Sequence, residues 1–393
     1  MINSQYDIVV IGAGIHGVGV AQAAAAKGYS VLVLEQSAIA AGTSSKSSKL
    51  IHGGLRYLET GQLGLVKECL RERALLLKLA PELVKLVPFY IPVYQQSKRG
   101  PWKIRAGLAL YQLLAGNSSA SRFQSLDKER WSELDGLEQE GLLAVFRYHD
   151  AQTDDVLLSK AVMASAQRLG AQLCVPARFV HGVIHKGYCD VHFEFQNSAF
   201  QCTAKVIVNA AGPWVNDVRE NMSPQGINFN VELVQGTHVI VDGQLDGGIY
   251  YLEAPRDQRA VFVMPWHQQI LIGTTENVYR GNPADVKPLP DEIDYLLQTY
   301  HHYFPQVQQR NVVSAFAGLR VLPASSASPF KRRRDVQLLL DNEDEPRLLS
   351  IVGGKLTAYR ATAEQVMRRL QRSLPPSSAQ GDTRTLPLVL PDV

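Results

Sequence analysis

Cysteine is scarce in this sequence, with only four residues in a chain of 393. None belongs to a C-x-x-C pair, and their spacings match no zinc-binding pattern. We therefore expect neither a metal site nor a disulfide framework, but free thiols in a reducing cytoplasm. The four residues are Cys69, Cys174, Cys189 and Cys202.

Long apolar runs and a large net charge are also missing. No stretch approaches the roughly 18 uninterrupted apolar residues of a membrane-spanning helix, and no basic-apolar leader opens the chain. The net charge is only +3, although short basic clusters occur at 98–99 and 331–334, so we expect no nucleic-acid partner. A cytoplasmic protein is predicted, with contact to the inner face of the cytoplasmic membrane left open, as is homo-oligomerisation.

The length and the 46% hydrophobic content suit a soluble protein of two domains, at about 150 residues each. Residues 6–11 read as a buried strand, 18–27 as an alanine-rich helix and 30–35 as a second strand. A G-x-G-x-x-G turn, Gly12 to Gly17, joins the first strand to the helix. This βαβ unit of about 30 residues is typical of a dinucleotide site, with the pyrophosphate at the helix N-terminus.

Glu35 ends the second strand, 18 positions after Gly17. A carboxylate there can accept hydrogen bonds from ribose hydroxyls, and it disfavours the 2′-phosphate of NADP. The loop from Thr43 to Tyr57 is dense in Ser and Gly, which suits close contact with a pyrophosphate and a flavin ring and favours FAD over NAD. A further strand-turn-helix at Gly353-Gly354-Lys355 could aim a helix N-terminus at the flavin.

Seven segments together resemble the FAD-dependent glycerol-3-phosphate dehydrogenase family, within the D-amino-acid-oxidase-like flavoproteins. They cover roughly residues 5–372 and read IGAGIHGVGVAQAAAAKG, TSSKSSKLIHGGLRYLE, NAAGPWV, QGTHVIV, VFVMPW, ILIGTTE and VGGKLTAYR. The resemblance implies an α/β fold: a glutathione-reductase-type, Rossmann FAD-binding domain with an inserted α+β substrate domain that is mostly antiparallel. We expect the FAD-binding domain to comprise 1–85, 150–220 and 315–375, the substrate domain 86–149 and 221–314, and a loosely ordered tail 376–393.

The implied cofactor is noncovalent FAD, since no cysteine occupies the flavin-anchoring positions of sarcosine-type oxidases. The expected cofactor contacts are Gly12, Gly14, Ile15, His16, Gly17, Glu35, Gln36, Thr43, Ser44, Ser47, Ser48, Leu50, His52, Gly53, Val180, Ala211, Gly212, Trp214, Gly318, Gly353, Gly354, Lys355, Leu356 and Thr357. The implied reaction is oxidation of the C2 hydroxyl of sn-glycerol 3-phosphate to dihydroxyacetone phosphate, with electrons passed to a membrane quinone or another acceptor.

A phosphorylated alcohol requires cations for its oxygens and a base for its hydroxyl proton. By resemblance, Arg56, Arg320 and Lys355 supply the cations, and Tyr57 and Thr275 also bind substrate. His52 and His238 are the two candidates for the base, and the residues do not decide between them. The predicted catalytic set is therefore His52, His238, Arg320 and Lys355.

Departures from the family pattern keep other functions open. The usual C-terminal helical domain is missing from this sequence, Val156-Leu157 stand where Ala-Arg is usual, and Val321 and Glu276 replace Pro and Asp. The alternatives are an FAD-dependent oxidase or dehydrogenase of a 2-hydroxy acid or amino acid, and a non-catalytic flavin-binding subunit.

Two further segments carry structural expectations. Residues 88–96 alternate around Pro88 and Pro92, which predicts an edge strand. Residues 102–114 predict an amphipathic helix with basic residues at its start, which could rest on an anionic bilayer and receive quinone, or pack on the body of the protein.

Overall fold

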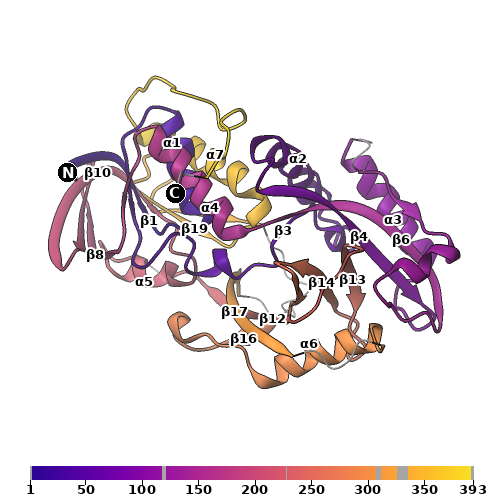
Figure 1. Cartoon of the computed structure of the whole chain (residues 1–393). Helices are drawn as coiled ribbons and strands as arrows, with labels where there is room; N and C mark the ends of the chain where they lie inside the picture. The colour runs from indigo at the N-terminus through magenta and orange to yellow at the C-terminus, as the bar shows by residue number, and fades with distance from the viewer. Residues whose placement is uncertain (1, 117–120, 227, 307–310, 325–334, 391–393) are drawn as a thin grey trace.

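The computed structural model describes residues 2–116, 121–226, 228–306, 311–324 and 335–390. Within these residues two large sheets lie side by side (Figure 1). The basic cluster at 331–334 lies outside the described residues.

The first sheet carries the βαβ unit predicted from the sequence. In the described part of the chain it has nine strands, β1 Gln5–Ile11, β2 Val31–Leu34, β7 Gln172–Cys174, β8 Ala177–Ile184, β9 Cys189–Phe195, β10 Ser198–Asn209, β11 Met222–Ser223, β18 Gln337–Leu340 and β19 Leu348–Val352. Strands β7, β2, β1, β10 and β19 are parallel neighbours. β2 and β19 are buried along their whole length, as are the last four residues of β1 and of β10, as expected for strands covered on both faces.

Three helices cover one face of this sheet, α1 Ile15–Ala26, α4 Asp155–Arg168 and α7 Tyr359–Leu370 (Figure 1). Small side chains in α1 allow the close packing, and a Cβ at Gly19 would lie 2.7 Å from the Tyr359 ring of α7. The α/β prediction is confirmed for this part of the chain.

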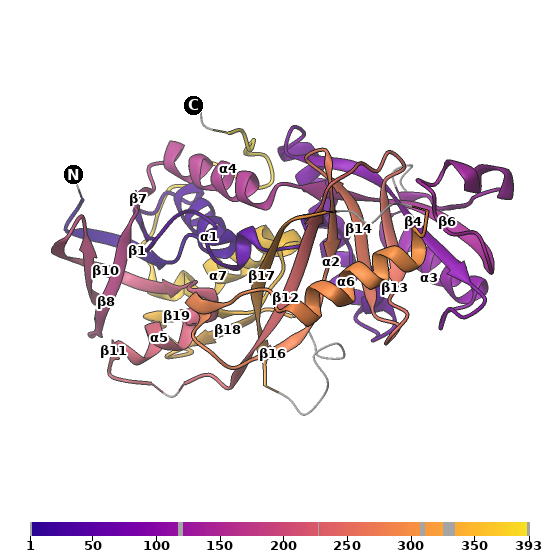
Figure 2. The same ribbon diagram turned by 60° about the horizontal axis from the view of Figure 1, so that its bottom comes forward.

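The second sheet is mostly antiparallel and has ten strands among the described residues. They are β3 Leu50–Ile51, β4 Val84–Tyr94, β5 Gln124–Ser125, β6 Leu142–Thr153, β12 Val231–Val241, β13 Ile249–Glu253, β14 Ala260–Trp266, β15 Gln269–Gly273, β16 Asn277–Tyr279 and β17 Val312–Pro323. Helix α6, Pro290–Tyr303, packs along β12, as Figure 2 shows, and α2 Leu63–Leu79 and α3 Pro101–Leu114 lie near β4 and β6. The short helix α5, Val215–Glu220, follows β10.

The division of the chain between the two sheets differs in detail from the expected boundaries. Positions 150 and 315 fall inside β6 and β17, and both strands belong to the second sheet. Each strand is long enough to run from the outer part of the second sheet to the junction with the first.

Strand β4 corrects the expectation of an edge strand at 88–96. It lies inside the second sheet, antiparallel to β6 along its whole length and parallel to β13. The pairing with β13 covers only Phe89 and Tyr90, so Pro88 and Pro92 lie just outside it. An interior strand therefore tolerates two prolines because its second neighbour is short.

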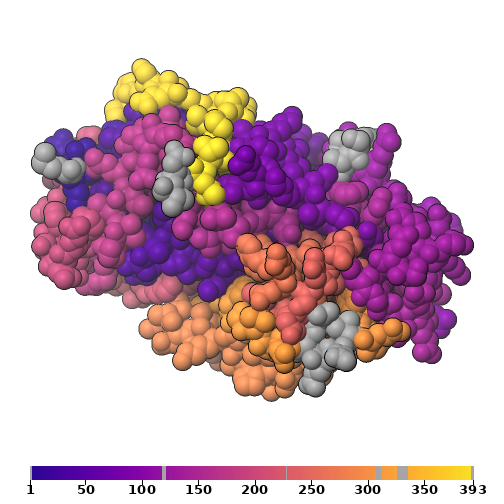
Figure 3. All heavy atoms as spheres, viewed as in Figure 1, coloured from indigo at the N-terminus to yellow at the C-terminus, as the bar shows by residue number. Residues whose placement is uncertain are grey.

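The segment after α7 corrects a second expectation. The sequence predicts a loosely ordered tail at 376–393, but its described part, 376–390, packs across the helices of the first sheet and contributes to the yellow ridge at the top of Figure 3. The backbone N–H of Gln380 donates to the Ala26 carbonyl at 2.8 Å, and that of Leu388 donates to the Leu79 carbonyl at 2.8 Å. Leu388 and Thr383 are buried there.

Candidate active site

In the turn after β1, steric constraints require glycine at two positions. Gly12 has φ +100°, and a Cβ there would lie 2.8 Å from the Ala210 carbonyl oxygen. A Cβ on Gly17 would lie 1.9 Å from the Gly12 carbonyl oxygen. Gly14 is the N-cap of α1 and has no side chain to cover the end of the helix. The N-terminus of α1 therefore faces the cavity beside it. This leaves space and a positive helix end for a phosphate group.

Glu35 lies beside that turn. One carboxylate oxygen accepts from the Ala13 backbone N–H at 2.8 Å, and the other accepts from the Ser37 N–H at 2.9 Å. The side chain is buried against the protein yet lines the cavity. It has remaining acceptor capacity for ribose hydroxyls, as the sequence predicted.

The cavity has a volume of about 1010 Å³, at the top of the range of roughly 300–1,000 Å³ usual for small-molecule sites. Most of the residues expected to contact the cofactor line it: Gly12, Gly14, Ile15, His16, Glu35, Gln36, Thr43, Ser44, Ser47, Ser48, Leu50, His52, Ala211, Gly212, Trp214, Gly318, Gly353, Gly354, Lys355, Leu356 and Thr357. Segments far apart in the sequence therefore converge on one elongated space.

Three expected contacts lie outside this lining. Gly17 packs on Gly12, and Gly53 donates its backbone N–H to the Tyr111 hydroxyl at 2.8 Å. Val180 is set back from the cavity, while its neighbours Arg178 and Phe179 line it.

The cavity fits FAD. It joins a helix N-terminus, an acidic group for a ribose and the Gly353-Gly354 turn, where Gly354 has φ +99° and would place a Cβ 2.3 Å from the His16 ring. Burial lowers the pKa of His16 to about 4, so this imidazole is neutral and adds no charge to the site. No cysteine is among the described residues that line the cavity.

A second cavity of about 90 Å³ adjoins the first and shares Ser48, His52, Tyr57 and Arg320 with it. Arg56, Arg259 and Glu276 also line it. Two of the arginines share the one carboxylate: Glu276 accepts from Arg259 at 3.0 Å and from Arg320 at 3.3 Å. Among the described residues that line this cavity, three guanidinium groups stand against one carboxylate.

Arg320 and Arg259 are enclosed to a similar degree, with side chains 25% and 23% exposed. Arg320 projects from β17, and burial, followed by the charges of Arg56 and Arg259, lowers its pKa to about 10. It therefore remains cationic at neutral pH, in surroundings that strengthen its attraction to an anion. Burial also lowers the pKa of Arg259.

The two histidine candidates occupy different places. His52 lines both cavities, and its backbone N–H donates to the Thr357 hydroxyl at 3.1 Å. His238 is only 1% exposed and lines neither; its Nε2 lies 2.9 Å from the Ser48 hydroxyl, which lines both. His238 thus stands one residue behind the cavity wall.

The remaining residues predicted to bind substrate also lie in different places. The Lys355 ammonium lies 3.5 Å from the centroid of the Tyr57 ring, so these two lie together at the first cavity. Thr275 is buried behind the second cavity, where its hydroxyl donates to Glu292 at 2.7 Å and accepts from the Thr237 N–H at 2.9 Å. Its neighbour Thr274 lines the second cavity instead.

Sequence reasoning did not select Arg259 or the aromatic residues Tyr148, Tyr251 and Phe262, which also line the second cavity. Arg259 directly precedes β14, and only the pairing of β14 with β13 and β15 brings it near Arg320. In the part of the chain that the structure describes, no group of three His, Cys, Asp or Glu side chains could hold a metal ion, and no helix is long and apolar enough to cross a membrane.

Comparisons with known proteins agree with this geometry. Residues 7–360 match the sequence profile of a family described as FAD dependent oxidoreductase. The chain is 39% identical to a glycerol-3-phosphate dehydrogenase of Pseudomonas aeruginosa over 93% of this chain and 72% of the relative. It is 36% identical to a D-erythritol 1-phosphate dehydrogenase of Brucella abortus over 94% of this chain and 74% of the relative.

Among solved structures, the fold is similar to that of the Bacillus halodurans glycerol-3-phosphate dehydrogenase complexed with FAD. The TM-score is 0.77 at 25% identity, over 98% of this chain and 68% of that one.

Proposed function

Because this chain belongs to the family of FAD-dependent oxidoreductases, we propose that it oxidises the C2 hydroxyl of sn-glycerol 3-phosphate to dihydroxyacetone phosphate. The proposal combines the reaction named for its relatives with the chemistry of the second cavity. That cavity is small, it is lined by aromatic and positively charged side chains, and it lies next to the expected cofactor space.

The charge balance of the second cavity carries the proposal. Arg56, Arg259 and Arg320 exceed Glu276 by two positive charges, which matches the charge of about −1.5 to −2 on a phosphate monoester at neutral pH. A 2-hydroxy acid or an amino acid would bring a single carboxylate and balance less of this positive charge. The dianion of a phosphorylated substrate therefore suits the residues that line this cavity better.

The residues divide the chemical work as follows. The flavin, when bound, supplies the acceptor for the hydride from C2. We assign the phosphate to the arginines of the second cavity, and stabilisation of the substrate oxygens to Arg320 and Lys355. His52 lines both cavities and is our choice for accepting the hydroxyl proton, with the Ser48–His238 pair as the alternative.

Anaerobic mixing of the purified holoenzyme with sn-glycerol 3-phosphate tests the reaction directly. We expect rapid bleaching of the flavin absorbance near ~450 nm, because hydride transfer reduces the ring. A flavin that stays oxidised with this substrate would contradict the glycerol-phosphate assignment while leaving FAD binding intact.

A substrate panel separates the alternatives in the same experiment. D-erythritol 1-phosphate is included because a relative of similar identity carries that name. Glycerol without phosphate, a 2-hydroxy acid and a D-amino acid test the need for the dianion. Bleaching by the last two and not by the phosphates would favour the rival oxidase, and no bleaching by any of them would favour a non-catalytic flavin subunit.

Helix α3 suggests how the reduced flavin is reoxidised. Its outward face exposes Trp102 (83%) and Leu113 (63%), with exposed Lys98, Lys103 and Arg105 beside them. Apolar side chains flanked by basic residues suit the surface of an anionic bilayer. We therefore propose that the protein lies on the inner face of the cytoplasmic membrane and passes electrons to a quinone there.

Replacing Trp102 and Leu113 together by serine tests this surface. We expect affinity for phosphatidylglycerol vesicles to fall by about tenfold or more, since two large apolar side chains no longer enter the bilayer. Co-sedimentation measures binding, and anaerobic bleaching should be unchanged. Val389→Ser, at another exposed apolar position, should keep vesicle binding; equal binding by all three proteins would refute the surface.

A further inference from the structure

Lys49 adopts an unusual backbone conformation next to the cofactor cavity. Its φ of +59° lies in the left-handed region, which residues other than glycine seldom occupy. Hydrogen bonds hold it there: its carbonyl accepts from the Thr153 N–H at 2.9 Å, its N–H donates to the Ser47 hydroxyl at 3.1 Å, and its ammonium donates to the Ser45 carbonyl at 2.6 Å. Strained residues of this kind cluster at functional sites.

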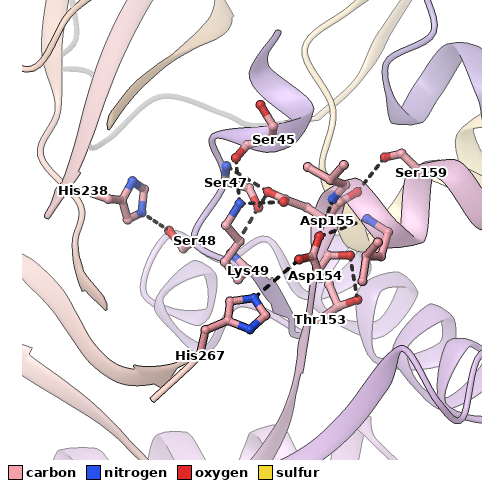
Figure 4. Close-up of polar contacts among 12 residues, drawn as sticks. Ser45, Ser47, Ser48, Lys49, Thr153, Asp154, Asp155, Ser159, His238 and His267 are labelled. Atoms are coloured by element: carbon pink, nitrogen blue, oxygen red, sulfur yellow. Dashed lines mark hydrogen bonds and ion pairs between the residues drawn. The ribbon is translucent and has the colours of Figure 1, made fainter. Parts of the chain in front are cut away.

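The ammonium of Lys49 is paired with Asp155, the first residue of α4 (Figure 4). The Nζ–Oδ1 distance is 2.6 Å, and both side chains are buried. The second oxygen of Asp155 accepts from the Ser47 hydroxyl at 2.7 Å and from the Ser47 N–H at 3.2 Å. Burial raises the pKa of Asp155, and the charge of Lys49 opposes that rise.

Stability alone is a weak reason for this pair. The N-cap of α4 is Asp154, which accepts from the Val156 and Leu157 N–H groups, so the helix does not need Asp155 as its cap. Replacing a buried ion pair by apolar side chains is often neutral or stabilising. The pair is better explained by the position that it imposes on the segment from Ser45 to Lys49.

The same ammonium also faces the second sheet. It lies 5.5 Å from the centroid of the Trp266 ring of β14 and 5.3 Å from that of Phe316 of β17. Phe316 in turn stacks on His238 of β12, with ring centroids 5.0 Å apart. Lys49 therefore joins α4 of the first domain to the strands that carry His238 and Arg320.

Ser48 lies in the sequence between Ser47 and Lys49, and both of these donate hydrogen bonds to Asp155. Its hydroxyl lines both cavities and lies 2.9 Å from His238 Nε2. A change in the conformation of Lys49 would move this hydroxyl away from the imidazole.

We propose that Lys49, held by Asp155, is a positioning residue that keeps Ser48 against His238 in the wall of the substrate cavity. This inference rests on the oxidation proposed above. The cations that face His238 are Arg320 of β17 and Lys49, while Lys46 lies over the far partner Phe316. Burial, then the charges of Arg320 and Lys49, lower the pKa of His238, so the imidazole that Ser48 meets is neutral.

Two variants should differ in their effect on the pKa of His238. In Lys49→Met a cation is lost and the Asp155 carboxylate remains, so the pKa of His238 rises. In Asp155→Asn the cation remains, so His238 stays neutral as in the unmodified protein. NMR of histidine-labelled holoenzyme, assigned with His238→Gln, measures the titration. A merely structural role would loosen the site in both variants and raise the pKa in both.

Kinetics give a second readout. We expect both variants to lower kcat by about tenfold with KM within about twofold, because the cavity wall is misplaced while the phosphate-binding arginines remain. Lys49→Arg keeps the charge and should restore the His238 titration of the unmodified protein. If Lys49→Met fails to fold, the kcat and the His238 titration of Asp155→Asn and Lys49→Arg still test the positioning role.

Asp154→Asn is the matched control. It makes the same substitution one residue away, and asparagine also caps helices well. It should leave kcat and the His238 titration unchanged. If sn-glycerol 3-phosphate does not reduce the unmodified enzyme but His238 responds as described, the proposed function fails and the positioning role stands. Unchanged titration and kcat in Lys49→Met and Asp155→Asn of an active enzyme overturn the positioning role.

Discussion

Replacing Arg320 by alanine lowers the turnover of sn-glycerol 3-phosphate by at least about a hundredfold, as the loss of a positioned charge in an enclosed site commonly does. The guanidinium lies beside both cavities, and burial with two neighbouring cations has already lowered its pKa to about 10. Alanine removes this charge. Glu276, which is almost fully buried, then keeps the hydrogen bond from Arg259 and loses the one from Arg320. The cavity then attracts a phosphate less strongly than before.

The measurement is stopped-flow reduction of the bound flavin, with kcat and KM from steady-state assays. Flavin content should not change, because Arg320 lies at the substrate end of the cavity. Arg130→Ala removes an exposed arginine that pairs with Glu133 and should retain full activity. Wild-type-like rates in Arg320→Ala would remove this residue from the mechanism.

Replacing Gly17 by alanine abolishes flavin binding or lowers FAD affinity by at least about a hundredfold. The new Cβ would lie 1.9 Å from the Gly12 carbonyl oxygen, a backbone atom that has no room to move because Gly12 itself packs on Ala210. The turn and the start of α1 must therefore separate, which displaces the helix N-terminus from the phosphate position. The ratio of flavin to protein absorbance in the purified variant measures the loss.

Gly107→Ala is the control for the loss of a helical glycine. A Cβ at this position in α3 meets no atom within 4 Å, so we expect normal flavin content and a gain of up to about 1 kcal/mol in stability. Normal flavin content in Gly17→Ala would show that the turn can relax and that the close packing of Gly17 is not needed for the cofactor.

Much of the first domain was predictable because its signals are local. The strand, glycine turn, helix and second strand at 6–34 follow one another in the sequence, and Glu35 directly follows the second strand, where its carboxylate accepts from the turn. The serine-rich loop and the Gly353-Gly354 turn also carried their own composition signals, and the structure places both along the cofactor cavity.

The errors arose where a neighbour in space decides the outcome. Pro88 and Pro92 indicated an edge strand, yet β13 is short enough to pair between them. The proline- and serine-rich end of the chain resembled a loose tail, but Arg360 of α7 and backbone groups of α1 and α2 bind it to the body.

The sequence by itself determined the dinucleotide-binding unit and favoured FAD, because the backbone geometry of a glycine turn and the period of buried strands are properties of neighbouring residues. The cationic candidates followed from the resemblance of its motifs to a known family, and the two histidines from their places in those motifs. Tertiary structure alone decided which candidates line the same cavity. It brings Arg259, Glu276 and Arg320 together from separate segments, places His238 behind Ser48, and joins Lys49 to Asp155 across more than a hundred residues. Charge balance and hydrogen-bond reach depend on distances of a few ångströms, and those distances are set only when the two sheets pack.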